Sequence, residues 1–182
     1  MSTVPQPVSA EQLAALPPGK RYELVKGELK MMSPAGGQHG LIAMQIGSML
    51  NHHVRKHKLG RVFAAETGFR LATEPDTVRA PDVAFVGSGK MSTVENLVGY
   101  LPFAPDLAVE VVSPNDSFSA VESKAEMWLQ SGCKMCLVVD PENQSVRVYR
   151  NTSVIEVLHS GDTLDANDVV EGWQVAVAEF FA

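Results

Sequence analysis

Apolar residues in this chain recur with two periods, one typical of strands and one typical of helices. Short apolar runs bounded by Gly, Pro, Asn or Asp are typical of β-strands, whereas apolar residues three and four positions apart indicate an amphipathic helix. We predict a short capped helix within 9–16, a long helix at 39–58 that ends at Gly60, and a second helix at 119–131. We predict strands at 22–25, 28–32, 61–72, 77–86, 106–112, 134–140, 145–150 and 154–159.

The order of these elements predicts the fold class. Strands and helices do not alternate strictly, so we do not expect a doubly wound parallel sheet; we expect a mixed α/β (α+β) domain with a central sheet flanked by helices. Residues 1–20 are rich in Pro, Ala and Ser and are predicted to form an N-terminal arm, and 21–182 to form a single domain. We predict a hairpin at 22–32 with its turn at Lys26-Gly27, and a loop at 87–105.

Composition narrows the class of protein. The chain has 182 residues, of which 45% are hydrophobic and 20% charged, as is typical of a folded domain. No apolar run approaches the roughly 20 residues that a membrane helix needs. The first 18 residues lack the basic start and apolar centre of a signal peptide. We therefore expect a cytoplasmic protein with no membrane partner.

Two acidic residues interrupt apolar strands. Asp82 lies within the run 79–86 and Glu110 within the run 106–112. Burying a carboxylate is costly unless it is paired or binds a metal. Side chains alternate along a strand, so Glu110 shares a face with Ala108, whose small side chain leaves room beside it. Because Mg²⁺ prefers one or two carboxylates plus water and phosphate, we predict that Asp82 and Glu110 hold Mg²⁺ or Mn²⁺.

Lys124 lies within the apolar stripe of the helix at 119–131, which also contains Val121, Ala125, Trp128 and Leu129. A Lys on a buried face has a partner or a function. Two interpretations stay open. The amine orients a water or stabilises charge that develops on a phosphate, or it extends toward solvent and pairs with an acid.

The net charge of −6 weighs against nucleic acid as a partner, because phosphate binding draws on a basic surface. The segment 52–61 is an exception, since it holds four cations, three histidines and no acid. It is either a patch for a polyanion or the solvated end of a helix, where cations suit the helix dipole.

Several segments between about residues 20 and 160 resemble the Uma-type putative restriction endonucleases of the PD-(D/E)XK nuclease superfamily. The resemblance rests on the following segments: Tyr22-Glu-Leu-Val-Lys-Gly-Glu-Leu29, Met32-Ser-Pro34, His39-Gly40, Gly68-Phe-Arg-Leu71, Arg79-Ala-Pro-Asp-Val-Ala-Phe-Val86, Pro105-Asp-Leu-Ala-Val-Glu-Val-Val-Ser-Pro114 and Lys124. It implies a restriction-endonuclease-like core, DNA as the substrate and products that carry a 5′-phosphate.

The resemblance also assigns residues. It implies that Asp82 and Glu110 match the metal-binding acids of the superfamily. The superfamily pattern has a Lys two residues after the second acid, and here that position is Val112. Uma-type sequences look as though this Lys has moved to the next helix, and Lys124 matches the moved position.

Four more residues are weaker candidates. Glu23 and Glu28 match acidic positions of the family, and one of them is a candidate further ligand; we include Glu28 in the predicted catalytic set. The alternative for each is an exposed hairpin charge. His39 and Arg70 are candidates for supporting the acids or contacting phosphate. The alternative for His39 is a hydrogen bond at the helix start, and the alternative for Arg70 is a pair across the strand.

The function predicted from these residues is a divalent-metal-dependent endonuclease that hydrolyses DNA phosphodiester bonds, and a homodimer would suit double-strand cutting. The alternative is a catalytically degenerate member of the same fold that binds nucleic acid or protein, which the net charge and Val112 favour. A small-molecule hydrolase ranks below both, because the chain lacks a Gly-x-Ser-x-Gly motif or another nucleophile signature.

Overall fold

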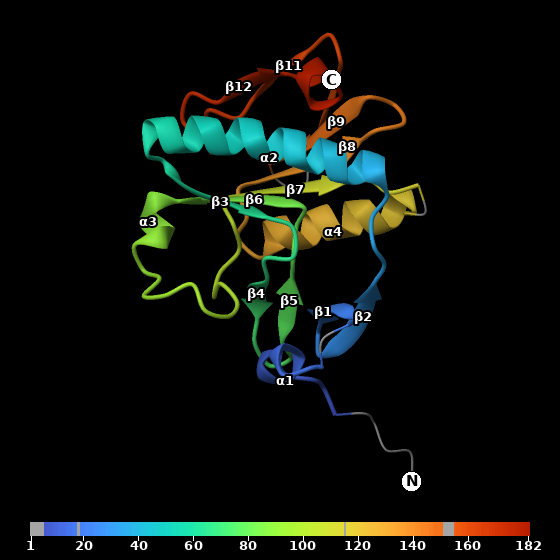
Figure 1. The fold of residues 1–182 in the computed structure, drawn as a ribbon, viewed down its shortest axis with the longest axis vertical. Coiled ribbons are helices and arrows are strands. Elements are labelled where there is room, and N and C mark those ends of the chain that lie inside the picture. Colours follow the sequence, from blue (N-terminus) through green and yellow to red (C-terminus); the bar gives the residue numbers. More distant parts are fainter. Residues whose placement is uncertain (1–5, 18, 115, 151–154) are drawn as a thin grey trace.

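The computed structural model describes residues 6–17, 19–114, 116–150 and 155–182. Its central element is a mixed sheet that is seen nearly edge-on in Figure 1. Strands β7 and β8 run parallel, and the other neighbouring pairs are antiparallel. The six strands, in spatial order, are β10 (Ile155–His159), β9 (Ser145–Tyr149), β8 (Met135–Asp140), β7 (Leu107–Val111), β6 (Val83–Gly87) and β3 (Gly60–Ala64). The mixed sheet confirms the predicted fold class.

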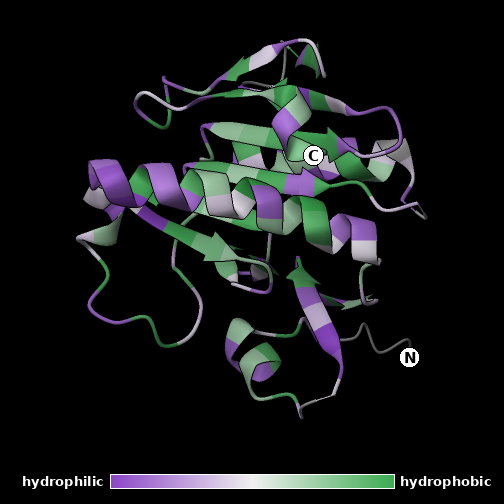
Figure 2. Ribbon diagram, turned by 45° about the horizontal axis from the view of Figure 1, so that its top comes forward, coloured by the Kyte–Doolittle hydropathy of each residue, from purple (hydrophilic) through white to green (hydrophobic). Residues whose placement is uncertain are grey.

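Helices α2 (Gly37–His57) and α4 (Phe118–Gln130) cover opposite faces of this sheet (Figure 1). Alternation along β7 explains why both faces are apolar: Leu107, Val109 and Val111 pack in the core under α2, and Ala108 packs in the core under α4. Figure 2 shows the sheet strands as largely hydrophobic and α2 as a mixture of hydrophobic and hydrophilic residues. By the same alternation, Glu110 lies on the α4 side.

A second sheet of four strands lies beside the first (Figure 1). Its strands, in spatial order, are β2 (Glu28–Met32), β1 (Arg21–Val25), β5 (Thr77–Arg79) and β4 (Phe69–Ala72). Strands β1 and β2 form the predicted hairpin. Lys26 and Gly27 both have positive φ, at 50° and 78°, which is the requirement of a type I′ turn.

The strands predicted at 61–72 and 77–86 are each divided between the two sheets, so the prediction of two long strands was wrong. Pro81 has no N–H to donate to a sheet, and the chain leaves β5 and enters β6 around it. In the other segment Glu66 has φ of 71°, which takes the backbone out of the strand conformation. The chain passes from the central sheet into the smaller one at the first break, near Glu66, and returns to the central sheet at the second, near Pro81.

The helices begin and end close to the predicted positions. Helix α4 differs from the prediction by one residue at each end. Helix α2 ends at His57, followed by Lys58 with φ of 58°, so that Lys58 and not Gly60 supplies the left-handed residue. A short helix, α3 (Ser88–Met91), lies in the segment predicted to be a loop. The C-terminal part contains β11 (Thr163–Asp165), β12 (Gln174–Ala176) and the 3-10 helix η1 (Val177–Phe180).

The N-terminal arm contains helix α1 (Ala10–Ala14), capped by Ser9 in a capping box with Gln12. Parts of the predicted arm, residues 1–5 and 18, and the predicted start of β10 at Val154 lie outside the described residues. The arm is held by Asp76, whose carboxylate accepts the N–H of Ala10 at 2.7 Å and pairs with Arg70. Within the described segments, no helix is both long and apolar enough to cross a bilayer.

The Asp76 contacts predict a pH-dependent contribution to stability. The N–H of Ala10 and the guanidinium of Arg70 hold the pKa of Asp76 below its usual value, against the opposing effect of burial. A depressed folded-state pKa stabilises the fold above the unfolded-state pKa, and this contribution is lost as pH falls through the folded-state value. We expect Asp76→Asn to lower the free energy of unfolding by roughly 1–3 kcal/mol at pH 7 and by less at pH 3.

Urea denaturation at the two pH values measures this difference. The matched control is Glu171→Gln, which changes an exposed carboxyl group. An equal loss of stability at pH 3 and pH 7 would contradict the assigned role of the Asp76 carboxylate.

Candidate functional site

Asp82 directly precedes β6, and Glu110 lies in the neighbouring strand β7. Val83 of β6 pairs with Val109 of β7, so the next positions along the two antiparallel strands are Asp82 and Glu110. The N–H of Asp82 donates to the carbonyl of Val109 at 3.0 Å, and the N–H of Val111 donates to Oδ2 of Asp82 at 2.8 Å, so Asp82 contacts β7 on both sides of Glu110. The strand pairing therefore brings together two acids that are 28 positions apart in the sequence.

Both oxygens of the Glu110 carboxylate are hydrogen-bonded to helix α4. Oε2 accepts from Nζ of Lys124 at 2.6 Å, and Oε1 accepts from the indole Nε1 of Trp128 at 2.7 Å. Glu110 is only 5% exposed. Burial raises its pKa to about 7, with the negative charge of Asp82 adding to the shift and Lys124 opposing it. The carboxyl group thus changes charge near neutral pH.

The amine of Lys124 points inward, toward the acids. Besides its contact with Glu110, Nζ lies 3.8 Å from Oε1 of Glu23. Burial favours the neutral amine, but the carboxylates of Glu110 and Glu23 outweigh burial and raise the pKa of Lys124. The Lys124 side chain is therefore a partly buried donor whose charged form is favoured at neutral pH.

Asp82, Glu110, Glu23 and Lys124, with the side chains that contact them, are called the acidic group below. Asp82 lies at its more accessible side. Its Oδ2 accepts the N–H of Val111 at 2.8 Å and lies 3.2 Å from Nε2 of His39. His39 is the third residue of α2. The hydrogen bond to Asp82 raises the pKa of His39, although burial opposes it. The side chain of Asp82 is about one-fifth exposed, so water reaches this carboxylate.

The structure places Glu23, and not Glu28, with this group. Glu23 is buried, and its two oxygens accept from the N–H of Ala80 and from Arg79, each at 3.1 Å. Glu28 lies next to the hairpin turn, is exposed, and pairs with Lys30 at 2.9 Å. The two residues occupy the paired strands of one hairpin, and of these two strands β1 pairs with β5, the strand that leads to Asp82.

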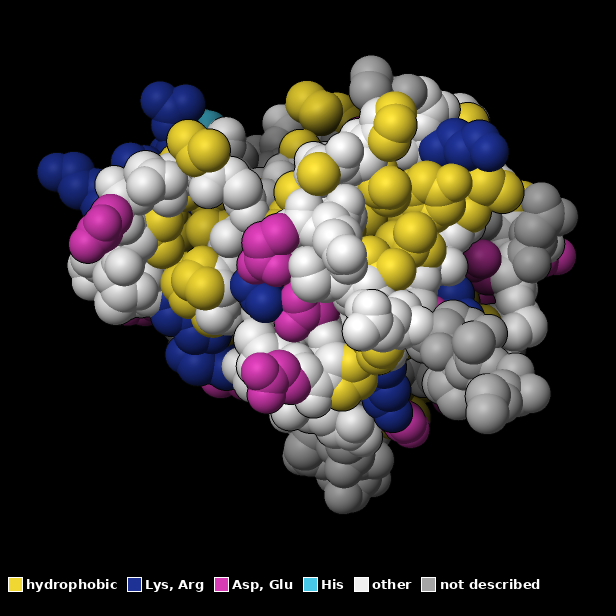
Figure 3. Space-filling model, turned by 90° about the horizontal axis from the view of Figure 1, so that it is seen from below, with side chains coloured by type: hydrophobic (Ala, Val, Ile, Leu, Met, Phe, Trp, Pro, Cys, Tyr) yellow, Lys and Arg dark blue, Asp and Glu magenta, His cyan; other side chains and the backbone are white. Residues whose placement is uncertain are grey.

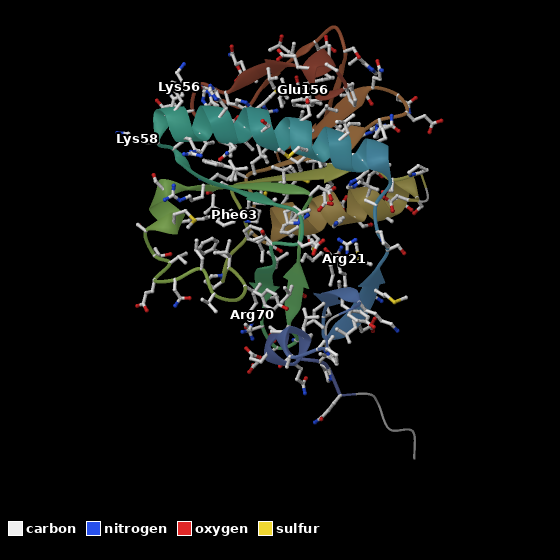
Figure 4. All side chains as sticks on the ribbon, viewed as in Figure 1. Arg21, Lys56, Lys58, Phe63, Arg70 and Glu156 are labelled. Atoms are coloured by element: carbon white, nitrogen blue, oxygen red, sulfur yellow. The ribbon has the colours of Figure 1, made fainter. Side chains whose placement is uncertain are left out.

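Two other candidates lie elsewhere. Arg70 pairs with Asp76 and Glu11 beside helix α1, at the lower end of the smaller sheet (Figure 4). The cation cluster at 52–61 occupies the C-terminal end of α2, roughly 25 Å along the helix from His39. Figure 4 labels Lys56 and Lys58 at this end of α2, and Figure 3 shows Lys and Arg side chains on the same, left side of the molecule. The cluster is thus not part of the acidic group.

Two residues of the group were missed as functional candidates. Trp128 was predicted only as part of an apolar stripe, and Arg79 only as part of a strand. A signal for Trp128 exists in the sequence, because a buried indole N–H needs an acceptor and Trp128 follows Lys124 by one helical turn. The acceptor itself, Glu110, is 18 residues away in another element.

The donor chemistry of the group fits a hard cation held by few protein ligands. Within the part of the chain that the structure describes, no three His, Cys, Asp or Glu side chains form a ready set of metal ligands. Asp82 and Glu110 nevertheless supply two carboxylates, and water reaches Asp82. This combination suits Mg²⁺ or Mn²⁺, which take one or two carboxylates and complete their coordination with water and phosphate oxygens.

Comparisons with known proteins agree with this fold. The chain resembles the crystal structure of a putative nuclease belonging to DUF820 from Anabaena variabilis ATCC 29413, with a TM-score of 0.82 and 23% sequence identity. The match covers 96% of this chain and 98% of that chain. No curated protein matches. At this level of identity the likeness establishes the shared fold.

A family model identifies the chain itself. The model of the Uma2 family, described as putative restriction endonucleases, matches residues 10–178. This range contains both sheets and every residue of the group described above. The chain therefore belongs to the Uma2 family of putative restriction endonucleases.

Proposed function

We propose that this protein is a divalent-metal-dependent endonuclease that hydrolyses phosphodiester bonds of DNA. The observation that carries the proposal is the meeting of two acids and one amine: Nζ of Lys124 lies 2.6 Å from Glu110, and Asp82 is hydrogen-bonded to Val109 and Val111, the residues on either side of Glu110. Membership of the Uma2 family supports a nuclease role. The proposed cofactor is Mg²⁺ or Mn²⁺.

Asp82 and Glu110 are the residues that would hold the cation. When bound, a divalent cation at these carboxylates offsets charge on the scissile phosphate and lowers the pKa of water. Asp82 is itself held in place, because Val111 and His39 both contact its Oδ2. The contact with Asp82 raises the pKa of His39, which favours the charged imidazole beside that oxygen.

Lys124 acts as a donor in this proposal. Because the neighbouring carboxylates raise its pKa, the ammonium has no lone pair with which to take a proton from water. It instead aligns the attacking water or stabilises the negative charge that develops on the phosphate oxygens. Glu23, 3.8 Å away, limits the directions in which the amine can point.

The proposed reaction is a hydrolysis. The oxygen of water bonds to phosphorus, the bond between phosphorus and O3′ breaks, and the leaving oxygen gains a proton, so the product keeps a 5′-phosphate. Two copies of the chain would supply one site for each strand of a duplex, which is why a homodimer belongs to the proposal.

A second candidate is a non-catalytic binding module with the same fold. The net charge of −6 favours it, as does the full use of both Glu110 oxygens within the chain. Isothermal titration with Mn²⁺ separates the two candidates. The nuclease binds Mn²⁺ and loses that binding on Asp82→Asn, whereas the degenerate module binds none.

The acids are expected to be essential. Asp82→Asn and Glu110→Gln should reduce Mg²⁺-dependent cleavage of plasmid DNA to background, because each removes a charged ligand while keeping the side-chain shape. Glu28→Gln is the matched control, since it neutralises an exposed acid outside the group. Cleavage that survives in either of the first two variants, with melting temperatures like wild type, would refute the assignment.

Substitution of the amine tests the Lys124 role. Lys124→Met keeps much of the apolar side chain, removes the charge and leaves the Glu110 carboxylate without its cation. We expect cleavage to fall roughly 10²–10³-fold. Lys30→Met is the control, since Lys30 pairs only with the exposed Glu28 among the contacts that the structure gives. Equal cleavage by both variants in a gel assay would exclude a catalytic amine.

Metal binding is expected to depend on pH near neutrality. Burial raises the pKa of Glu110 to about 7, and only its ionised form is a good ligand. The ionised fraction falls about tenfold between pH 8 and pH 6 for a pKa near 7, so the Mn²⁺ association constant should fall about tenfold. Calorimetry at pH 6, 7 and 8 measures it. An association constant that is flat across this range would contradict a metal site at Glu110.

A further inference from the structure

The indole of Trp128, which needs an acceptor for its buried N–H, finds that acceptor in a carboxylate of the site. Trp128 is fully buried among apolar residues, yet its Nε1 donates to Oε1 of Glu110 at 2.7 Å. A buried indole N–H is usually satisfied by a nearby backbone carbonyl or water. Here the acceptor is the carboxylate that we propose as a metal ligand.

Trp128 and Lys124 act on Glu110 as a pair. They are four residues apart in α4 and therefore project from the same face of the helix, one turn apart. Lys124 contacts Oε2 and Trp128 contacts Oε1. Two donors on one rigid helix thus fix both oxygens of the carboxylate, and with them its rotation about the last side-chain bond.

The orientation of the indole is itself fixed by packing. The ring of Phe69 meets the Trp128 ring edge to face, with centroids 6.2 Å apart and an interplanar angle of 87°. Phe63 packs on Phe69 in the same manner, at 6.1 Å and 88°. Both contacts lie in the core between α4 and the sheet. The N–H is therefore aimed at Glu110 by the aromatic cluster and not by the hydrogen bond alone.

We propose that Trp128 is a positioning residue of the site, which holds the Glu110 carboxylate in one orientation before a cation binds. The proposal rests on the function proposed above. Each carboxylate oxygen has a second lone pair, so a cation can share an oxygen with the indole. A ligand that is already oriented loses less freedom on binding, and groups that orient metal ligands typically contribute 10–100-fold to metal affinity.

The protein contains a matched control. The chain has two tryptophans, and the other, Trp173, is also buried. Trp173 stacks on Phe180 at 6.5 Å in the core on the opposite face of the sheet. Trp→Phe at either position removes an indole from a packed core, but only Trp128→Phe removes a donor to Glu110.

The first experiment needs no metal. Uniformly ¹⁵N-labelled protein should give two indole N–H peaks, and Trp173→Phe assigns them. We expect the Trp128 peak to move upfield in Glu110→Gln, because a neutral amide is a weaker acceptor than a carboxylate, while the Trp173 peak stays in place. An unmoved Trp128 peak would overturn the proposal.

The second experiment measures Mn²⁺ affinity by calorimetry. Trp128→Phe should weaken Mn²⁺ binding roughly 10–100-fold, whereas Trp173→Phe should bind like wild type. Melting temperatures measured alongside show how much each variant loses through packing. Equal Mn²⁺ affinities in the two variants would overturn the positioning role and make Trp128 a core residue only.

The two experiments also separate this proposal from the proposed function. Wild-type protein that binds no Mn²⁺ would refute the metal-dependent nuclease, and with it any role of Trp128 toward a cation. Normal Mn²⁺ binding by wild type and by Trp128→Phe would refute the role of Trp128 alone and leave the nuclease proposal in place.

Discussion

The ion pair between Lys124 and Glu110 is the interaction on which the arrangement of the site depends. It joins helix α4 to the central strand β7, and through Glu23 it reaches the smaller sheet. Glu110 is buried, so removal of Lys124 would leave a buried carboxylate unpaired, which typically costs about 3–5 kcal/mol. The same contact therefore holds three parts of the fold together and brings the amine to the acids.

Charge balance explains how such a polar group is tolerated beside two apolar cores. Three carboxylates, those of Glu23, Asp82 and Glu110, each contact a basic side chain: Arg79, His39 and Lys124 respectively. A divalent cation would thus enter a group that already contains basic side chains, and it would share Glu110 with an ammonium that is 2.6 Å away. Under the proposed function, Lys124 pairs with Glu110 in the metal-free protein. It remains beside the phosphate when a cation is bound.

Much of the fold could be predicted because turns, helix limits and strand faces depend on residues that are close in sequence. The hairpin with its Lys26-Gly27 turn, the limits of α4 and the alternation along β7 all follow from residues that are close in sequence. The division of the two predicted long strands between the sheets could not be predicted from nearby residues, although Pro81 lies at one of the breaks. Whether a break is a kink within one sheet or a crossing to another depends on partners elsewhere in the chain, here β1 on one side and β7 on the other.

The sequence by itself determined which residues are unusual: two acids in apolar strands and one Lys on an apolar helix face have no local reason to be there. Only the tertiary structure decided which other residues accompany them. Glu23 accepts a hydrogen bond from the N–H of Ala80, 57 positions away, while Glu28 is exposed to solvent. Arg70 forms ion pairs with Asp76 and Glu11. Local periodicity specifies which face of an element a side chain occupies, but not what lies opposite that face. The pairing of strands and the docking of α4 decide that second question.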